Sequence, residues 1–154
     1  MSDDLGLLLV VDDEELNRDM LSRRLEVEGF RTLIAADAHE GLRLLEEHDF
    51  DAVLMDAMMP GISGYEALAE IRKHRSPLEL PVLMVTAKNQ NEDVVNAFEV
   101  GANDYITKPI NFPVAIARIN CHIAGRRMSS QLAQVKSAIR CRRKAPTTDY
   151  GIGI

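Results

Sequence analysis

Most of the apolar runs in this chain of 154 residues lead directly into side chains that can do chemistry. Three carboxylates that converge repel one another, and a divalent cation removes the conflict. Oxygen ligands with room for water suit Mg²⁺, and an ionised aspartate beside Mg²⁺ can attack phosphorus. A lysine, a hydroxyl and backbone N–H groups can then neutralise the phosphoryl oxygens. The residues are Asp12 and Asp13 after Leu7–Val11, Asp56 after Ala52–Met55, Thr86 after Pro81–Val85, and Lys108 after Asp104–Thr107.

Each of these residues also has an ordinary structural role open to it. Asp12 or Asp13 is suited to cap a helix, and Asp56 to the loop that precedes Pro60. Thr86 fits a hydroxyl that caps a strand end, and Lys108 taken alone fits a solvated lysine. We favour a shared site because all of them stand at the ends of apolar runs.

The apolar runs alternate with helical patterns, which predicts one α/β domain. Three runs are nearly continuous in Val, Leu and Met, as in parallel strands covered on both faces, and two weaker runs suit the sheet edges. Strict alternation predicts a doubly wound (βα)5 fold with a five-stranded parallel sheet and helices on both faces. In such sheets the site lies beyond the carboxyl ends of the strands. The strands are expected at Leu7–Val11, Arg31–Ala35, Ala52–Met55, Pro81–Val85 and Asp104–Thr107, and helices follow them around residues 16–27, 38–45, 65–71, 94–100 and 112–123.

Four stretches of the chain resemble the receiver domain of bacterial two-component response regulators. They are LLLVVDDEELNRDML, DAVLMDAMMPGISGYE, PVLMVTAK and GANDYITKPI, which arrive in the family's order and spacing over roughly residues 5–123. Ser63-Gly64 stands where the family often has Asp-Gly, and Ser is an adequate helix N-cap. The resemblance implies a flavodoxin-like three-layer sandwich.

The resemblance also implies a role for each residue of the site. Asp56 would be the phosphoacceptor. The metal, Mg²⁺ with Mn²⁺ as a substitute, would be held by Asp12, Asp13, Asp56 and the backbone carbonyl of Met58. Thr86 and Ala87 would bind phosphate and act in the switch with Lys108 and Tyr105, although Tyr105 also fits an ordinary half-buried strand residue. The Lys108–Pro109 peptide bond is expected to be cis, and the side chains of Met58 and Lys88 would flank the path of the water that removes the phosphoryl group.

As a receiver, the chain would be a phosphorylation switch and not an enzyme in the usual sense. A sensor histidine kinase or a phosphotransfer protein would phosphorylate it, and a partner or a phosphorylation-linked homodimer would read the result. A haloacid-dehalogenase-type phosphatase uses similar residues, but there a second Asp stands two positions after the nucleophile that ends the first strand. Here Glu14 follows Asp12 at that spacing, and the chain has no cap insertion. A flavin-binding module is disfavoured because the acids would repel the flavin phosphate.

Composition and charge limit the remaining classes. No apolar run approaches the roughly 18–20 residues of a membrane span, and the acidic N-terminus is no signal peptide. Two cysteines make neither a disulfide framework nor a metal cluster, so we expect cytosolic thiols and a cytoplasmic protein. Residues 1–104 carry 23 acids and 9 bases, and residues 105–154 carry 1 acid and 9 bases. The acidic body argues against binding of nucleic acid through the body and leaves the role of the basic tail open. The tail has neither a helix-turn-helix pattern nor aromatic residues between its basic ones, which disfavours direct reading of DNA.

Residues 124–154 are expected to form a basic helical extension beyond the receiver domain of residues 1–123. Four apolar residues of this extension are spaced four, three and four positions apart. Ile116, Ile119 and Ile123 do not continue this spacing, which predicts a kink or break near Gly125. The end, KAPTTDYGIGI, is predicted to be disordered. The basic run fits a solvated helix end or a contact with an acidic surface or nucleic acid, and the helix resembles a linker to an output domain beyond residue 154. The four apolar residues are Met128, Leu132, Val135 and Ile139, and the basic run is Arg140, Arg142, Arg143 and Lys144.

Overall fold

A computed structural model describes residues 4–87 and 91–144 and confirms the predicted alternation of strands and helices. The elements differ from the expected ranges mainly at their ends: β3 ends one residue later than predicted, β4 begins and ends one residue later, and α5 is much longer. The strands are β1 (Leu7–Val11), β2 (Arg31–Ala35), β3 (Ala52–Asp56), β4 (Val82–Thr86) and β5 (Asp104–Thr107). The helices are α1 (Glu15–Glu28), α2 (Ala38–Glu47), α3 (Gly64–Arg72), α4 (Asn91–Val100) and α5 (Phe112–Lys144).

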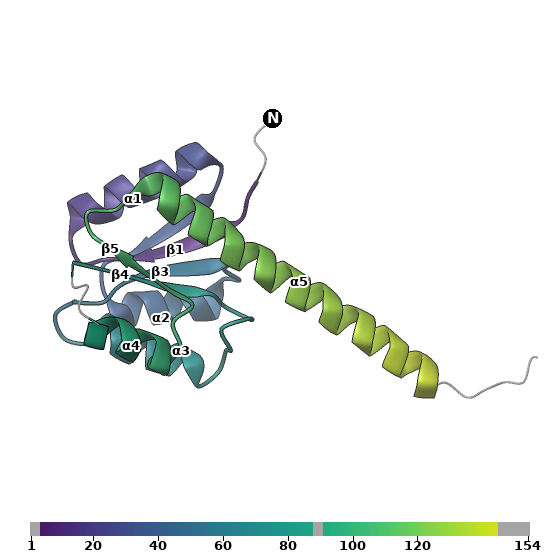
Figure 1. The fold of residues 1–154 in the computed structure, drawn as a ribbon. Coiled ribbons are helices and arrows are strands. Elements are labelled where there is room, and N and C mark those ends of the chain that lie inside the picture. The colour runs from purple at the N-terminus through teal and green to yellow at the C-terminus, as the bar shows by residue number, and fades with distance from the viewer. Residues whose placement is uncertain (1–3, 88–90, 145–154) are drawn as a thin grey trace, which may run out of the picture.

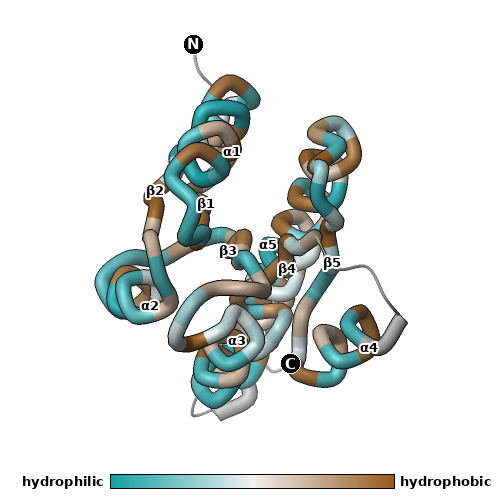
Figure 2. The backbone as a smooth tube through the Cα atoms, turned by 90° about the vertical axis from the view of Figure 1, so that its left-hand side faces the viewer, coloured by the Kyte–Doolittle hydropathy of each residue, from teal (hydrophilic) through white to brown (hydrophobic). Residues whose placement is uncertain are grey.

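The five strands form one parallel sheet in the order β2-β1-β3-β4-β5, which Figure 2 shows from left to right. The weaker apolar runs, β2 and β5, are the edge strands, as predicted. Helices α1 and α5 cover one face of the sheet, and α2, α3 and α4 cover the other (Figure 1). Alternate residues of a strand therefore enter different cores: Leu8 packs with α1 and α5, whereas Leu9 packs with α2 and α3. Burial on both faces explains why β1, β3 and β4 are almost continuously apolar.

Local signals fix several helix ends. Gly29 follows α1 with φ of 113°, a left-handed conformation that glycine adopts without a steric penalty. The Ser63 side chain caps α3 by accepting a hydrogen bond from the Glu66 N–H at 3.2 Å, so Ser does replace Asp adequately at this position. The Asp37 carboxylate caps α2 in the same way, with the Glu40 N–H at 2.8 Å.

The predicted break near Gly125 is wrong, because α5 is one helix from Phe112 to Lys144. Figure 1 shows this helix running past the body of the domain without interruption. The two apolar frames are two faces of the same helix: Ile119 and Ile123 are buried against the sheet, whereas Met128 is exposed. Residues seven apart, such as Ile116 and Ile123, share a face, but residues five apart, such as Ile123 and Met128, lie on opposite sides. The change of frame therefore needs no kink.

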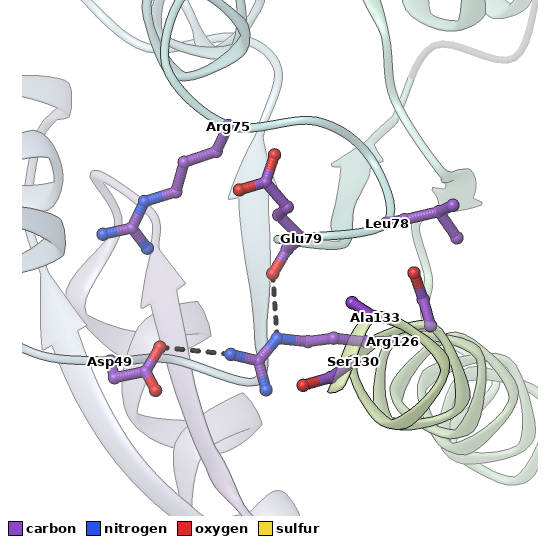
Figure 3. Close-up of a pocket in the computed structure, with 8 residues that line it drawn as sticks. Asp49, Arg75, Leu78, Glu79, Arg126, Ser130 and Ala133 are labelled. Carbon is purple, nitrogen blue, oxygen red and sulfur yellow. Dashed lines mark hydrogen bonds and ion pairs between the residues drawn. The ribbon is translucent and has the colours of Figure 1, made fainter. Parts of the chain in front are cut away.

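The turn of α5 that follows Ile123 is tied to the body of the domain (Figure 3). The Arg126 guanidinium donates to the carbonyl of Glu79 at 2.8 Å, to Asp51 at 3.0 Å and to Asp49 at 3.1 Å. Arg127 donates to the carbonyl of Leu5 at 2.9 Å. These bonds cross the boundary that the sequence places after residue 123, which remains a prediction.

A partly buried arginine that the sequence did not single out holds the loops at the amino-terminal edge of the sheet. The Arg72 guanidinium donates to the Gly101 carbonyl at 2.7 Å, to the Leu80 carbonyl at 2.9 Å and to the Asn103 side chain at 2.8 Å. Burial lowers the pKa of Arg72 to about 10, a value at which the group is still charged near neutral pH. A Cβ at Gly101 would lie 2.9 Å from the Arg72 side chain, so glycine leaves room for this contact.

Candidate metal and phosphoryl site

The residues predicted to act together do meet at the carboxyl edge of the sheet. Asp12 follows β1, Asp56 is the last residue of β3, Thr86 is the last residue of β4, and Lys108 follows β5. Asp12 and Asp56 are buried, with 4% and 6% of their surfaces exposed, whereas Asp13 is exposed. The site is therefore a partly buried acidic cluster with one open side.

The three aspartates are close enough to bind one metal ion. One carboxylate oxygen from each of Asp12, Asp13 and Asp56 lies within 4.8 Å of the others. The Lys108 Nζ atom lies 3.3 Å from Asp12 Oδ2 and 3.8 Å from Asp56 Oδ2, so a positive charge borders the same cluster. Carboxylate oxygens with an open side are the ligands that Mg²⁺ accepts together with water and a phosphate.

The carboxyl group of Asp56 has a raised pKa. Burial raises its pKa from 3.8 to about 6, with Lys108 opposing the rise and the negative charge of Asp12 adding to it. The Met58 N–H, which donates to Asp56 Oδ1 at 3.2 Å, also favours the ionised form, whereas contact with Asp13 raises the pKa. A bound cation would therefore relieve the repulsion between the carboxylates of this site.

The backbone around the carboxylates is held tightly. Asp12 Oδ1 accepts the Glu14 N–H at 2.9 Å, and the Asp12 carbonyl accepts from the Arg18 side chain at 2.9 Å. A Cβ at Gly64 would overlap the carbonyl oxygen of Asp56, so only glycine lets the start of α3 pack against the end of β3. Sequence reasoning missed both Arg18 and the packing role of Gly64, because neither residue belongs to the acidic cluster itself.

The other residues that the sequence assigns to the site lie on strand β4, on strand β5 and in the loops that follow the strands. Thr86 is buried and its carbonyl accepts the Lys108 N–H at 2.8 Å, while Ala87 is exposed just beyond β4. Tyr105 is buried on the α2–α3–α4 side of the sheet. Met58 lies two residues after Asp56, and half of its surface is exposed. The Lys108–Pro109 peptide bond is cis, and Lys88 lies outside the described residues.

Tyr105 packs in the same cluster as Tyr65 from α3. Burial raises the pKa of the Tyr65 phenol, and a hydrogen bond with Tyr105 contributes to the rise. Tyr105 thus occupies an inward position against α3, which suits a switch residue and an ordinary core tyrosine equally well.

Comparison with known proteins identifies the family. The family model described as "Response regulator receiver domain" matches residues 8–120. The transcriptional regulatory protein YvrH of Bacillus subtilis is 40% identical over 117 residues, which are 75% of this chain and 48% of YvrH. The chain thus spans about half the length of this curated relative.

Solved structures agree with the sequence comparison. A CheY-like receiver domain protein from Methanospirillum hungatei has a TM-score of 0.75 and 32% identity, over 82% of this chain and 99% of that one. NtrX from Brucella abortus has a TM-score of 0.78 and 29% identity, over 88% of this chain and 30% of that one. Within the described residues, no helix is long and apolar enough to cross a membrane. With its acidic triad and Lys108 at the expected strand ends, the chain belongs to the response regulator receiver domain family of two-component signalling.

Proposed function

We propose that this chain is a phosphorylation-dependent signalling switch that takes a phosphoryl group onto Asp56 from a sensor histidine kinase or a phosphotransfer protein. The observation that carries the proposal is the position of Asp56 between two acidic neighbours and Lys108. A receiver domain implies a histidine kinase partner and a signalling role instead of ordinary enzymatic turnover.

The residues fit a resident Mg²⁺ ion, with Mn²⁺ as a substitute. Asp12, Asp13 and Asp56 would supply carboxylate oxygens, and the backbone carbonyl of Met58 would be a further ligand. When bound, the ion neutralises negative charge on the carboxylates and on the incoming phosphoryl oxygens. Three carboxylates and one lysine leave a net negative charge at the site, which favours a divalent cation.

In the transfer step, an oxygen of ionised Asp56 attacks the phosphorus of the donor phosphohistidine. The new O–P bond forms as the N–P bond breaks, and its electron pair returns to the imidazole ring. Lys108, whose Nζ is 3.8 Å from Asp56 Oδ2, is placed to offset charge on the phosphoryl oxygens. Thr86, the last residue of β4, and the backbone of Ala87, just beyond it, would bind another phosphoryl oxygen.

The acyl phosphate would then shift an existing equilibrium of the α4–β5 side of the domain. Thr86 and Tyr105 would couple this change to the surface, which a partner or a second copy would read. YvrH is a transcriptional regulatory protein, and by analogy we propose an output module beyond residue 154 and a cytoplasmic location. The basic tail lacks the features of a DNA reader, so we assign no direct contact with nucleic acid to this chain.

Phosphoryl labelling tests this function directly. The chain is incubated with acetyl phosphate and Mg²⁺, and the acyl phosphate is measured by intact mass and mapped after chemical trapping. We expect at most one phosphoryl group per chain, located on Asp56 and absent from Asp56→Asn, while Asp19→Asn on the surface of α1 labels normally. Full labelling of Asp56→Asn would refute the assignment, and sustained turnover of a phosphomonoester would favour a phosphatase instead.

A further inference from the structure

The Arg18 side chain closes the turn that joins β1 to α1. Its Nη1 atom donates a hydrogen bond to the backbone carbonyl of Asp12 at 2.9 Å. Side chains on a helix point back toward the start of the helix, so an arginine at this position of α1 can reach the residue that follows β1. The Arg18 N–H donates to the Glu14 carbonyl at 2.9 Å, so the arginine stands on an ordered turn of the helix.

The carbonyl that Arg18 binds belongs to the peptide group between the two acidic neighbours. A peptide group is planar, so fixing its oxygen also fixes the direction in which Asp13 leaves the chain relative to Asp12. Other bonds hold the rest of Asp12: its N–H donates to the Ala35 carbonyl at 3.1 Å, and its carboxylate accepts the Glu14 N–H at 2.9 Å. Arg18 therefore completes the set of bonds that orients the Asp12–Asp13 pair.

Asp13 depends on this peptide group more than Asp12 does. Asp12 is buried and its Oδ2 atom lies 3.3 Å from Lys108 Nζ, whereas Asp13 is exposed. The backbone that carries an exposed carboxylate has the larger part in directing it. A rotation of the peptide group would thus move Asp13 away from the point where oxygens of Asp12, Asp13 and Asp56 lie within 4.8 Å of one another.

The positive charge of Arg18 does not favour this arrangement by itself. Arg18 lies near the start of α1, where the helix dipole favours negative charge. It also borders a cluster that would hold a cation, and two positive charges repel one another. The hydrogen bond, and not the charge, is therefore the contribution of Arg18 that can favour a cation site.

We propose that Arg18 is a positioning residue for the metal site, because its bond to the Asp12 carbonyl holds the Asp12 and Asp13 carboxylates at the angle that one small cation needs. The inference rests on the proposed function, which assigns Mg²⁺ to these aspartates. Arg18 does not touch the ion and acts through the peptide group that joins two of its ligands.

A comparison of two ions separates positioning from a general loosening of the domain. Mg²⁺ demands a nearly ideal octahedron of ligands, whereas the larger Ca²⁺ accepts irregular arrangements. Loss of Arg18 should weaken Mg²⁺ binding about tenfold, as loss of a contact that orients a metal ligand does elsewhere. Ca²⁺ binding should weaken by less than about threefold. Loss of the charge alone would instead strengthen the binding of both ions.

Titration of the whole 154-residue chain with each ion, followed by NMR of the backbone amides, measures both affinities. Arg18→Met removes the donor and the charge but keeps a long side chain. Arg23→Met is the matched control, because Arg23 is an exposed arginine on the same helix. The control should bind both ions as the wild-type chain does. Arg18 is itself only partly buried, so both variants should fold, and circular dichroism checks this.

The Asp13 amide reports the hydrogen bond directly, because its N–H belongs to the same peptide group as the Asp12 carbonyl. In the metal-free chain its resonance should move in Arg18→Met and stay in place in Arg23→Met. An unmoved resonance in Arg18→Met would overturn the proposal. Unchanged or tighter Mg²⁺ binding in Arg18→Met would also overturn it, and so would equal losses for Mg²⁺ and Ca²⁺.

The outcomes separate this inference from the proposed function. If the wild-type chain binds no Mg²⁺, the metal site and the role of Arg18 both fail. If the wild-type chain and Arg18→Met bind Mg²⁺ equally well, only the role of Arg18 fails. If the affinities change as expected but Asp56 takes no phosphoryl group, only the assignment of the phosphoacceptor fails.

Discussion

Replacing Asp56 with asparagine should stabilise the metal-free domain. The pKa of Asp56 is about 6 against an ordinary value of 3.8, and burial is the largest cause. A shift of about two units, at about 1.4 kcal/mol each, means that ionised Asp56 lowers the free energy of unfolding by about 3 kcal/mol. Asparagine removes the charge and keeps an oxygen that can accept the Met58 N–H.

The sign of the effect follows from proton binding. Folded Asp56 binds its proton more tightly than the unfolded chain does, so its ionisation reduces stability as pH rises from about 4 to about 6, and no further above that range. The gain from Asp56→Asn should thus be absent near pH 4 and complete by about pH 7. For a chain of this length the complete gain corresponds to a rise in Tm of roughly 9 °C.

Urea unfolding followed by circular dichroism, with EDTA present, measures the difference at several pH values. Comparing the two proteins cancels the titration of the other carboxylates. Glu46→Gln on the exposed surface of α2 is the matched control and should change stability by less than about 0.5 kcal/mol at every pH. A gain that is the same at pH 4 and pH 8, or below about 1 kcal/mol at pH 8, would refute the electrostatic argument.

Four further results are expected. Asp13→Ala should weaken Mg²⁺ binding at least about tenfold by calorimetry, because it removes a ligand and a charge, and unchanged affinity would mean that the metal is misplaced. A chain ending at Ile123 should fold and accept phosphate but unfold at lower urea than one ending at Arg127, which keeps the bonds to the body; failure to fold would make the extension part of the core. Met58→Asn should shorten an acyl-phosphate lifetime of minutes, since an amide can orient water where a thioether cannot, and should leave Mg²⁺ affinity nearly unchanged; a lifetime of seconds in both proteins would show that this residue does not set the rate. Arg72→Met should destabilise the domain by about 2–3 kcal/mol, because several partly buried carbonyls lose their donor. A change below about 1 kcal/mol would show that water replaces the donor.

The sequence predicted the sheet well because its strands are buried on both faces. A short continuous apolar run such as Leu7–Val11 is typical of a strand that is covered on both sides, and the order of elements then determines which residues share an edge. The acidic cluster follows from that edge, so Asp12 and Asp56 could be placed together from the sequence alone. The roles of Thr86 and Tyr105 remain predictions, because residue type and position alone do not report how a side chain moves.

The long-range anchors could not be predicted in the same way. Arg72 and Arg126 bind carbonyl groups of distant loops, and every residue has a carbonyl group, so no pattern of residue types marks the acceptors. The predicted break at Gly125 failed for a related reason. A change in the spacing of apolar residues shows that a different side of the helix becomes apolar. Only the fold shows that one of these sides packs against the sheet and that the other is exposed.

Because α5 is unbroken, a tilt of the helix where it is bound to the body moves its far end. From Arg126, where the helix is bound to the body, to its end at Lys144 are 18 residues, or about 27 Å of rigid rod at 1.5 Å per residue. A tilt of about 5° at the base would carry the far end through about 2 Å, enough to change which side chains interdigitate with a neighbour. A flexible linker of the same length would not transmit such a tilt to its far end. The stiffness of α5 therefore determines how far a small rearrangement near the sheet displaces the end of the helix.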